Sequence, residues 1–239
     1  MTVVVAIDSF KGSIAAADAA RAVADGWLDV RADAAVLRPM ADGGEGTLDA
    51  FAAAVPDALR MPVRVTGPDG TPVDASWLLL PPTADAPAGT GVVELASTSG
   101  IELLGDRRLP WDADTTGFGQ AIAAALDHGV SRLVLGIGSS SSTDGGVGML
   151  QALGARFTDA AGAPIAPGAR DLAAVADVDR FQSESDAGTQ IFLRQLIEMH
   201  ASNLAVECEN MRLVGELCNA LEAAVNLPEG DSFDHGDVA

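Results

Sequence analysis

Near its amino terminus the chain reads Val3-Val4-Val5-Ala6-Ile7-Asp8-Ser9-Phe10-Lys11-Gly12-Ser13, and an alanine-rich segment follows. The run from Val3 to Ile7 is apolar and mostly β-branched, which is typical of a strand buried on both faces of a parallel sheet. Residues 14–28 carry apolar side chains at approximately helical spacing, and Ser13 can cap the start of that helix. The stretch therefore predicts a βα unit with a loop at the carboxyl end of its strand.

Lys11, in that loop, is the only lysine in a chain of 239 residues whose formal net charge is −20. One interpretation is an ordinary surface lysine, but the chain uses arginine at its other Lys/Arg positions. A cation next to the amino terminus of a helix is well placed to hold an anion. We therefore expect Lys11 to bind a phosphate or a carboxylate.

The composition excludes several classes of protein. A hydrophobic fraction of 48% is enough for one large or two modest domains, and a sequence pI near 4.2 argues against nucleic-acid binding. The first residues form neither a basic leader nor a membrane span, so we expect a cytoplasmic protein without a membrane partner. Cys208 and Cys218 lack the spacing of a zinc site or a redox pair, so we expect neither.

The pattern from residue 34 to residue 154 alternates between strands and helices. It predicts strands at 34–38, 92–95 and 132–136, a hairpin at 63–80 that turns at Gly67-Pro68-Asp69-Gly70, and helices at 45–54, 116–128 and around 149–153. The predicted fold class is α/β. We expect a Rossmann- or flavodoxin-like parallel-sheet domain beginning in residues 1–62, a second mixed α/β domain in residues 63–180, and a helical tail in residues 181–239.

The tail differs in composition from the rest of the chain. Asparagine is absent before Asn203, and both cysteines lie beyond that residue. The apolar residues of positions 188–226 follow an approximate helical stripe. Such a helix either packs on its own domain or associates with another helix, and a homo-oligomer is one form of that association.

Three glycine-bearing loops follow predicted strands, and this is where open α/β sheets bind ligands. The first holds Lys11, the second holds Asp42 and Glu45, and the third holds Asp144 after a run of serines. A cation, carboxylates and backbone N–H groups are what phosphoryl transfer requires. Two alternatives stand beside this interpretation: Asp42 and Glu45 only cap a helix, or the serine run is a flexible linker. No Walker A pattern is present.

The order of these motifs resembles the bacterial glycerate kinases over residues 3 to about 180, while residues 181–239 do not match. The resemblance rests on residues 8–13, 39–47, 94–96 (Glu-Leu-Ala), 115–117 (Thr-Thr-Gly) and 136–154. It implies ATP-dependent phosphorylation of glycerate, a requirement for Mg²⁺, and two α/β domains with the active site between them. Ser139 stands where the family usually has a glycine, which predicts a backbone less free to adopt positive φ.

With this resemblance, Lys11, Asp42 and Asp144 are the expected catalytic residues, and Asp42 and Asp144 are expected to hold Mg²⁺ or to orient the attacking hydroxyl. The expected contacts to substrate and phosphate are Ser9, Gly12, Ser13, Gly43, Gly44, Glu45, Ser140, Ser142, Gly145 and Gly146. The alternative function is a non-catalytic binding or interaction protein, derived from a kinase fold, whose tail is a partner-binding helix.

Overall fold

The computed structural model describes residues 1–179, and the predicted helical tail of residues 181–239 lies outside them. The described part is a mixed α/β fold, as predicted, with small parallel and mixed sheets. In chain order its elements are β1 (Thr2–Val5), α1 (Ala16–Leu28), β2 (Ala34–Leu37), α2 (Thr47–Ala54), β3 (Leu59–Thr66), β4 (Pro72–Leu80), β5 (Thr90–Glu94), α3 (Ala96–Ser99), a 3₁₀ turn (Ile101–Leu104), α4 (Thr116–Asp127), β6 (Arg132–Gly136), α5 (Val147–Ala152), β7 (Arg156–Thr158), a second 3₁₀ turn (Leu172–Ala174) and β8 (Asp177–Asp179).

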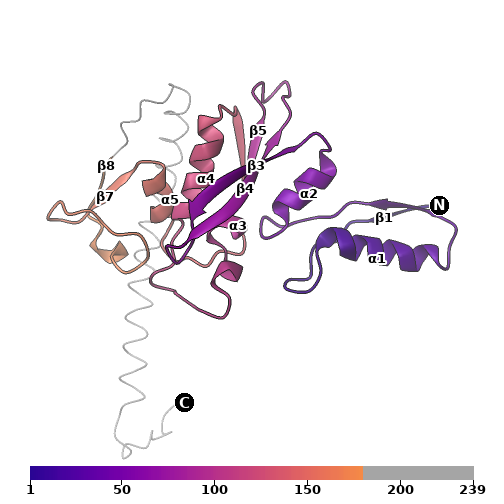
Figure 1. Ribbon diagram of the computed structural model, residues 1–239, viewed down its shortest axis with the longest axis horizontal. Helices are drawn as coiled ribbons and strands as arrows, with labels where there is room; N and C mark the ends of the chain where they lie inside the picture. Colours follow the sequence, from indigo (N-terminus) through magenta and orange to yellow (C-terminus); the bar gives the residue numbers. More distant parts are fainter. Residues whose placement is uncertain (180–239) are drawn as a thin grey trace, which may run out of the picture.

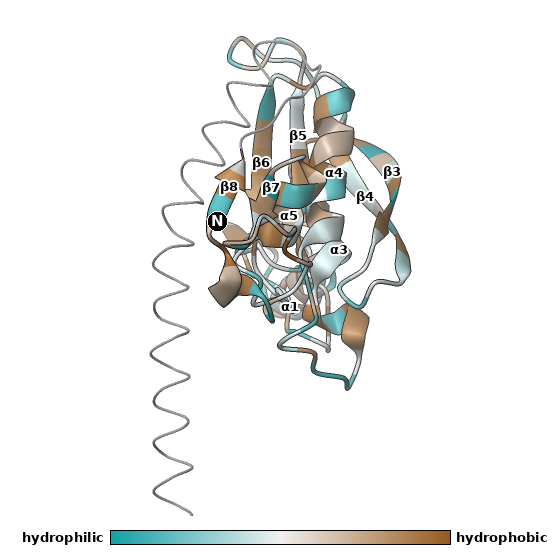
Figure 2. Ribbon diagram, turned by 90° about the vertical axis from the view of Figure 1, so that its left-hand side faces the viewer, coloured by the Kyte–Doolittle hydropathy of each residue, from teal (hydrophilic) through white to brown (hydrophobic). Residues whose placement is uncertain are grey.

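The main body is built on a four-stranded sheet in the order β3-β4-β5-β6. The pair β5–β6 is parallel and the other pairs are antiparallel. The predicted hairpin is confirmed: β3 and β4 pair from Leu59↔Leu79 to Thr66↔Pro72. Helices α4 and α5 bury Phe118 and Leu150 in the largest core cluster. Figure 2 shows hydrophobic stretches of β6 and β7 beside α5, where that cluster lies.

Close packing between α4 and α5 depends on a residue without a side chain. A Cβ added to Gly119 would lie 2.4 Å from the carbonyl oxygen of Met149 and 2.8 Å from the Cβ of Ala152. Real Cβ atoms do not approach other atoms so closely, so a larger residue would push the two helices apart.

We expect Gly119→Ala to lower the free energy of unfolding by about 1–3 kcal/mol through overpacking, although alanine favours helix formation over glycine by about 1 kcal/mol. Gly26 in α1 is the matched control, because a Cβ there meets nothing within 4 Å. Gly26→Ala should therefore raise stability by about 0.5–1 kcal/mol. Urea unfolding measures both changes, and a Gly119→Ala variant as stable as the parent would contradict this account of the helix packing.

The β1–α1–β2 arm, residues 2–37, extends from the main body (Figure 1). Its strands form a two-stranded parallel sheet in which Val3 pairs with Ala35. Helix α1 covers one face with Ala20 and Ala24, which pack against Val5. Val4 points away from this cluster and is 59% exposed. The prediction that this strand is buried on both faces is therefore wrong, because within residues 1–179 only one face of the sheet is covered by a helix.

Two helix starts differ from the sequence-based prediction. Helix α1 begins at Ala16, and Ser13 does not cap it, because the backbone N–H groups of Ser13 and Ile14 donate to the Phe10 carbonyl and close a turn before the helix. Helix α2 begins at Thr47 instead of residue 45. Gly46 adopts φ 84° there, which ends the preceding loop just before the helix.

The predicted boundary at residue 62 lies inside β3, which runs from Leu59 to Thr66. The division into domains stays a prediction. No helix within residues 1–179 combines the length and the apolar character needed to cross a bilayer.

Candidate functional site

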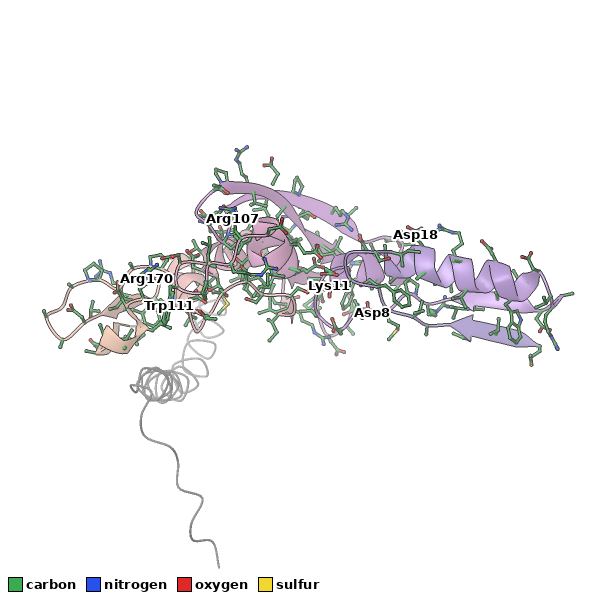
Figure 3. The ribbon with its side chains drawn as sticks, turned by 90° about the horizontal axis from the view of Figure 1, so that it is seen from below. Asp8, Lys11, Asp18, Arg107, Trp111 and Arg170 are labelled. Carbon is green, nitrogen blue, oxygen red and sulfur yellow. The ribbon has the colours of Figure 1, made fainter. Side chains whose placement is uncertain are left out.

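Three loops that are distant in the sequence meet in the structure, and we call them the three-loop cluster: residues 8–13, 39–46 and 137–146. The Lys11 Nζ lies 3.1 Å from the Ser139 Oγ and 3.4 Å from the Glu45 Oε2. The Gly138 N–H donates to the Gly43 carbonyl at 2.8 Å. Figure 3 shows Lys11 and Asp8 where the β1–α1–β2 arm joins the main body. The single lysine therefore connects all three loops.

The second and third loops approach each other through their glycines. A Cβ on Gly44 would lie 2.9 Å from the Ser139 Oγ and 3.2 Å from the Asp42 Oδ1. A Cβ on Gly138 would lie 2.7 Å from the backbone of Gly44, and Gly43 itself has φ 96°. The glycines at these positions are therefore required for the contact between the loops.

Ser139 adopts φ 57°, and it is the one non-glycine residue with positive φ among residues 1–179. Serine thus adopts positive φ here despite the steric cost that was expected for it in place of glycine. Three contacts hold the residue in this conformation: its hydroxyl accepts from Lys11 and donates to the Glu45 Oε2 at 3.4 Å, and its carbonyl accepts from the Ile101 N–H at 2.9 Å. Tertiary contacts thus override the ordinary backbone preference of serine.

We expect Ser139→Gly to raise the free energy of unfolding by about 1 kcal/mol, because glycine adopts left-handed φ without the steric cost that a Cβ brings. Ser139→Ala loses the same hydroxyl contact to Lys11 as Ser139→Gly but keeps the steric cost, so the alanine variant should not be more stable than the parent. Urea denaturation of the two variants tests this. Equal stability of the alanine and glycine variants would show that no strain is stored at this position.

A cavity of about 570 Å³ adjoins the three-loop cluster. Its volume is in the range of small-molecule sites. The predicted contact residues Ser9, Gly12, Ser13 and Glu45 line it, together with the first turn of α1, and Glu102 also lines it. Helix α1 begins without a side-chain cap, so the N–H groups of its first turn are available to an anion. The predicted catalytic residues Lys11, Asp42 and Asp144 do not line this cavity. Neither do the other predicted contact residues, Gly43, Gly44, Ser140, Ser142, Gly145 and Gly146.

Asp144 is 1% exposed, and both of its carboxylate oxygens are engaged. Its Oδ2 accepts from the N–H and hydroxyl of Thr115 and from the Gly148 N–H, at 2.7–3.0 Å. Its Oδ1 accepts from the Gly146 N–H at 3.1 Å. Asp144 therefore joins the start of α4 to the start of α5. In this conformation its carboxylate accepts hydrogen bonds from N–H and O–H groups of the protein itself.

The rest of the third loop is held by local bonds. The Ser140 and Ser142 hydroxyls lie 2.9 Å apart and bond to each other. Gly145 and Gly146 have φ 57° and 78°, so both use the backbone freedom that glycine provides. The bonds that hold this loop show that the serine run is a structured loop, and the interpretation as a flexible linker is wrong.

Glu94, at the end of β5, caps α2. It is 6% exposed, and its Oε2 accepts from the Leu48 N–H at 3.0 Å. Burial raises the pKa of this carboxyl, and the hydrogen bonds from the backbone of Leu48 and Thr47 partly oppose that increase. Asp42 instead accepts from Gly44 and Glu45 pairs with Lys11. The interpretation that Asp42 and Glu45 only cap the helix is therefore wrong.

Sequence reasoning gave no role to two other acidic residues near the loops. Asp8 follows β1 and accepts from the Ser9 N–H at 2.6 Å. Asp114, before α4, accepts from the Thr116 N–H, and burial raises the pKa of its carboxyl, with a smaller contribution from Asp144. The signal for Asp8 was present, because it sits at the carboxyl end of a strand beside Lys11.

The acidic residues of the site differ in how well they suit Mg²⁺. Within residues 1–179 no group of three or more His, Cys, Asp or Glu side chains could hold a metal ion. A nucleotide-bound Mg²⁺ needs only one or two carboxylates, because phosphates and water supply its other ligands. Asp42, in the second loop of the cluster, is exposed and fits that requirement. Asp144 does not fit it, because its oxygens already accept four protein hydrogen bonds.

Comparison with known proteins supports the family that the order of the motifs indicates. The sequence profile of the glycerate kinase family matches residues 3–195, so the match extends past the end predicted at about residue 180. A curated glycerate kinase from Bacillus subtilis is 41% identical over 181 residues, and a glycerate 2-kinase from Escherichia coli is 40% identical over 181 residues; each alignment covers 75% of this chain and 46% of the relative.

A Salmonella typhimurium LT2 protein, whose crystal structure was solved as that of a candidate glycerate kinase 2, superimposes with a TM-score of 0.61. It is 39% identical, and the match covers 75% of this chain and 47% of the Salmonella chain. The chain thus spans about half the length of the relatives that it matches. With a profile match over residues 3–195 and about 40% identity to curated members, the chain belongs to the glycerate kinase family.

Proposed function

We propose that this chain takes part in ATP-dependent phosphorylation of glycerate, and that the three-loop cluster is where the ligands bind. The observation that carries the proposal is the position of Lys11. Its ammonium contacts the second and third loops, and the first loop that bears it lines the adjoining cavity. A cation beside an uncapped helix start in a chain of net charge −20 is suited to a phosphate or a carboxylate.

Lys11 would neutralise the charge of a phosphate or of the glycerate carboxylate. It now pairs with Glu45 at 3.4 Å in an exposed setting, where ion pairs contribute little, so an incoming anion can displace that carboxylate. Ser9, Gly12 and Ser13 would donate from the same loop, and Gly43 and Gly44 would let the backbone of the second loop come close to the ligand.

Asp42 would hold the Mg²⁺ that accompanies ATP, or orient the glycerate hydroxyl. A bound Mg²⁺ would neutralise part of the negative charge on the phosphates. For Asp144 the geometry favours a supporting role, because its four hydrogen bonds fix the third loop and the starts of α4 and α5. Ser140, Ser142, Gly145 and Gly146 belong to that fixed loop. We propose that the serine hydroxyls and the Gly145 N–H donate to the phosphates, while the Gly146 N–H, which donates to Asp144, keeps the loop in place.

The finer fold assignment is also a proposal. Strand β1, helix α1 and strand β2 form a parallel βαβ unit, and we infer that this unit belongs to a Rossmann-like domain. Ligands of such domains bind beyond the carboxyl ends of the strands, which is where Lys11 and Asp42 lie.

A second candidate function is ligand binding without turnover. It is favoured by the two-stranded sheet of the arm, one face of which no helix covers within residues 1–179.

Calorimetric titration with Mg-ATP and with glycerate, together with an assay of ADP release and ³¹P detection of phosphoglycerate, distinguishes the two functions. Product formation supports the kinase. Binding of either ligand without product supports the second function. A chain that binds neither ligand would contradict both.

A further inference from the structure

One buried carboxyl connects the central sheet to the second loop of the site. Glu94 is the last residue of β5, and its Oε2 accepts from the Leu48 N–H, 46 positions earlier in the chain. Leu48 is the second residue of α2, and α2 follows directly after the loop of residues 39–46. The bond therefore fixes the start of α2, and with it the end of the loop that bears Asp42 and Glu45.

Helix α2 cannot be capped by the residue that precedes it. Gly46 has φ 84°, a conformation that favours glycine, and glycine has no side chain to accept the first N–H groups. In the loop before α5 the same need is met locally, since Asp144 accepts from Gly146 and Gly148. The corresponding Asp42 accepts from Gly44, which lies before α2. The acceptor for α2 must come from another element, and a carboxylate there is favoured by the helix dipole.

The two residues that hold the loop of residues 39–46, Glu94 and Gly136, are neighbours in the sheet. Glu94 is paired with Gly136 across the parallel strands β5 and β6. A Cβ on Gly136 would lie 2.8 Å from the Gly43 carbonyl oxygen. The loop is therefore held near its middle, at Gly43, by close backbone contact with β6, and after its end by the Glu94 side chain of β5.

We propose that Glu94 is a positioning residue that fixes the loop of residues 39–46 in the shape that binds ligand, an inference that rests on the proposed function. It acts through the Leu48 N–H and has no need to touch the substrate. Leu48 is 4% exposed, so without Glu94 its N–H is buried without an acceptor. The first turn of α2 then has to open toward water, and the preceding loop loses its fixed end.

The test compares Glu94→Ala, which removes the acceptor, with Glu94→Gln, which keeps an acceptor oxygen. Ile165→Ala is the matched control, because Ile165 is 5% exposed in the core beside β7 and its loss destabilises the chain away from the loop. Each full-length variant is studied at a temperature where its unfolding curve shows it to be fully folded. The readouts are amide hydrogen exchange of the peptide that covers residues 42–50 and calorimetric titration with glycerate.

We expect exchange of that peptide to become at least about tenfold faster in Glu94→Ala and to stay within about threefold of the parent in Glu94→Gln and Ile165→Ala. The Kd for glycerate should rise about tenfold in Glu94→Ala and be restored to within about threefold in Glu94→Gln. Equal exchange rates in Glu94→Ala and Ile165→Ala would overturn the positioning role. If the parent chain binds neither glycerate nor Mg-ATP, the proposed function fails, and the exchange rates still decide whether Glu94 anchors the loop.

Discussion

Under the proposed kinase function, Lys11→Ala should reduce the turnover of glycerate by about 10²–10³-fold, which corresponds to about 3–4 kcal/mol of lost charge stabilisation. The ammonium is the cation that reaches both Glu45 and Ser139, and phosphoryl transfer depends on positive charge around the phosphate oxygens. The side chain is 54% exposed, so its loss should change the free energy of unfolding by no more than about 0.5 kcal/mol. A coupled assay of ADP release measures the effect, with urea unfolding alongside.

Arg21→Ala is the matched control for Lys11→Ala. Arg21 is also an exposed cation, paired with Asp18 on the surface of α1, and its loss should leave turnover within about twofold of the parent. Lys11→Arg keeps the charge with a different shape and should retain part of the activity. Turnover of Lys11→Ala equal to that of Arg21→Ala would remove Lys11 from the mechanism.

Asp144→Ala should lower the free energy of unfolding by about 3 kcal/mol or more. The substitution removes the acceptor of four hydrogen bonds, and leaves the buried donors of Thr115 and Gly148 and the half-buried N–H of Gly146 without partners. Hydrogen bonds to a charged group contribute about 1.5–3 kcal/mol each, and an unsatisfied buried donor costs about 1–3 kcal/mol. Urea unfolding followed by circular dichroism measures the loss.

Asp159→Ala is the control for Asp144→Ala. Asp159 also accepts backbone N–H groups, from Ala161 and Ala163 at 2.8 Å, but in an exposed turn, so water can replace it and the loss should be at most about 1 kcal/mol. Asp144→Asn, which keeps one acceptor oxygen, should fall between the two alanine variants and provides a folded reference. Similar stabilities of the two alanine variants would contradict the structural role of Asp144.

Local signals in the sequence predicted much of the main body. The turn signal at Gly67–Gly70 gave the hairpin of β3 and β4, and the strand at Arg132–Gly136 has the predicted bounds. The order of motifs was enough to indicate the glycerate kinase family, which the comparisons confirm. These features follow from short stretches, so the residues that determine them lie close together in the chain.

Features that depend on distant contacts were not predictable. The run from Val3 to Val5 has the composition of a buried strand, but burial also depends on which elements cover the sheet, and Val4 is exposed. Ser139 takes a positive φ because of contacts to Lys11 and Ile101. The cap of α2 comes from Glu94, 46 positions from its partner, and no local pattern in the sequence points to it.

The outer edges of the two-stranded sheet in the β1–α1–β2 arm also affect colloidal behaviour. Within residues 1–179 the two strands have no further neighbours on their outer edges, and unpaired strand edges with β-branched side chains favour strand addition by other chains. The net charge of −20 opposes such contact by mutual repulsion at low ionic strength. Because the screening length shortens from about 10 Å at 0.1 M salt to about 3 Å at 1 M, the acidity of the chain protects this edge best in dilute buffer.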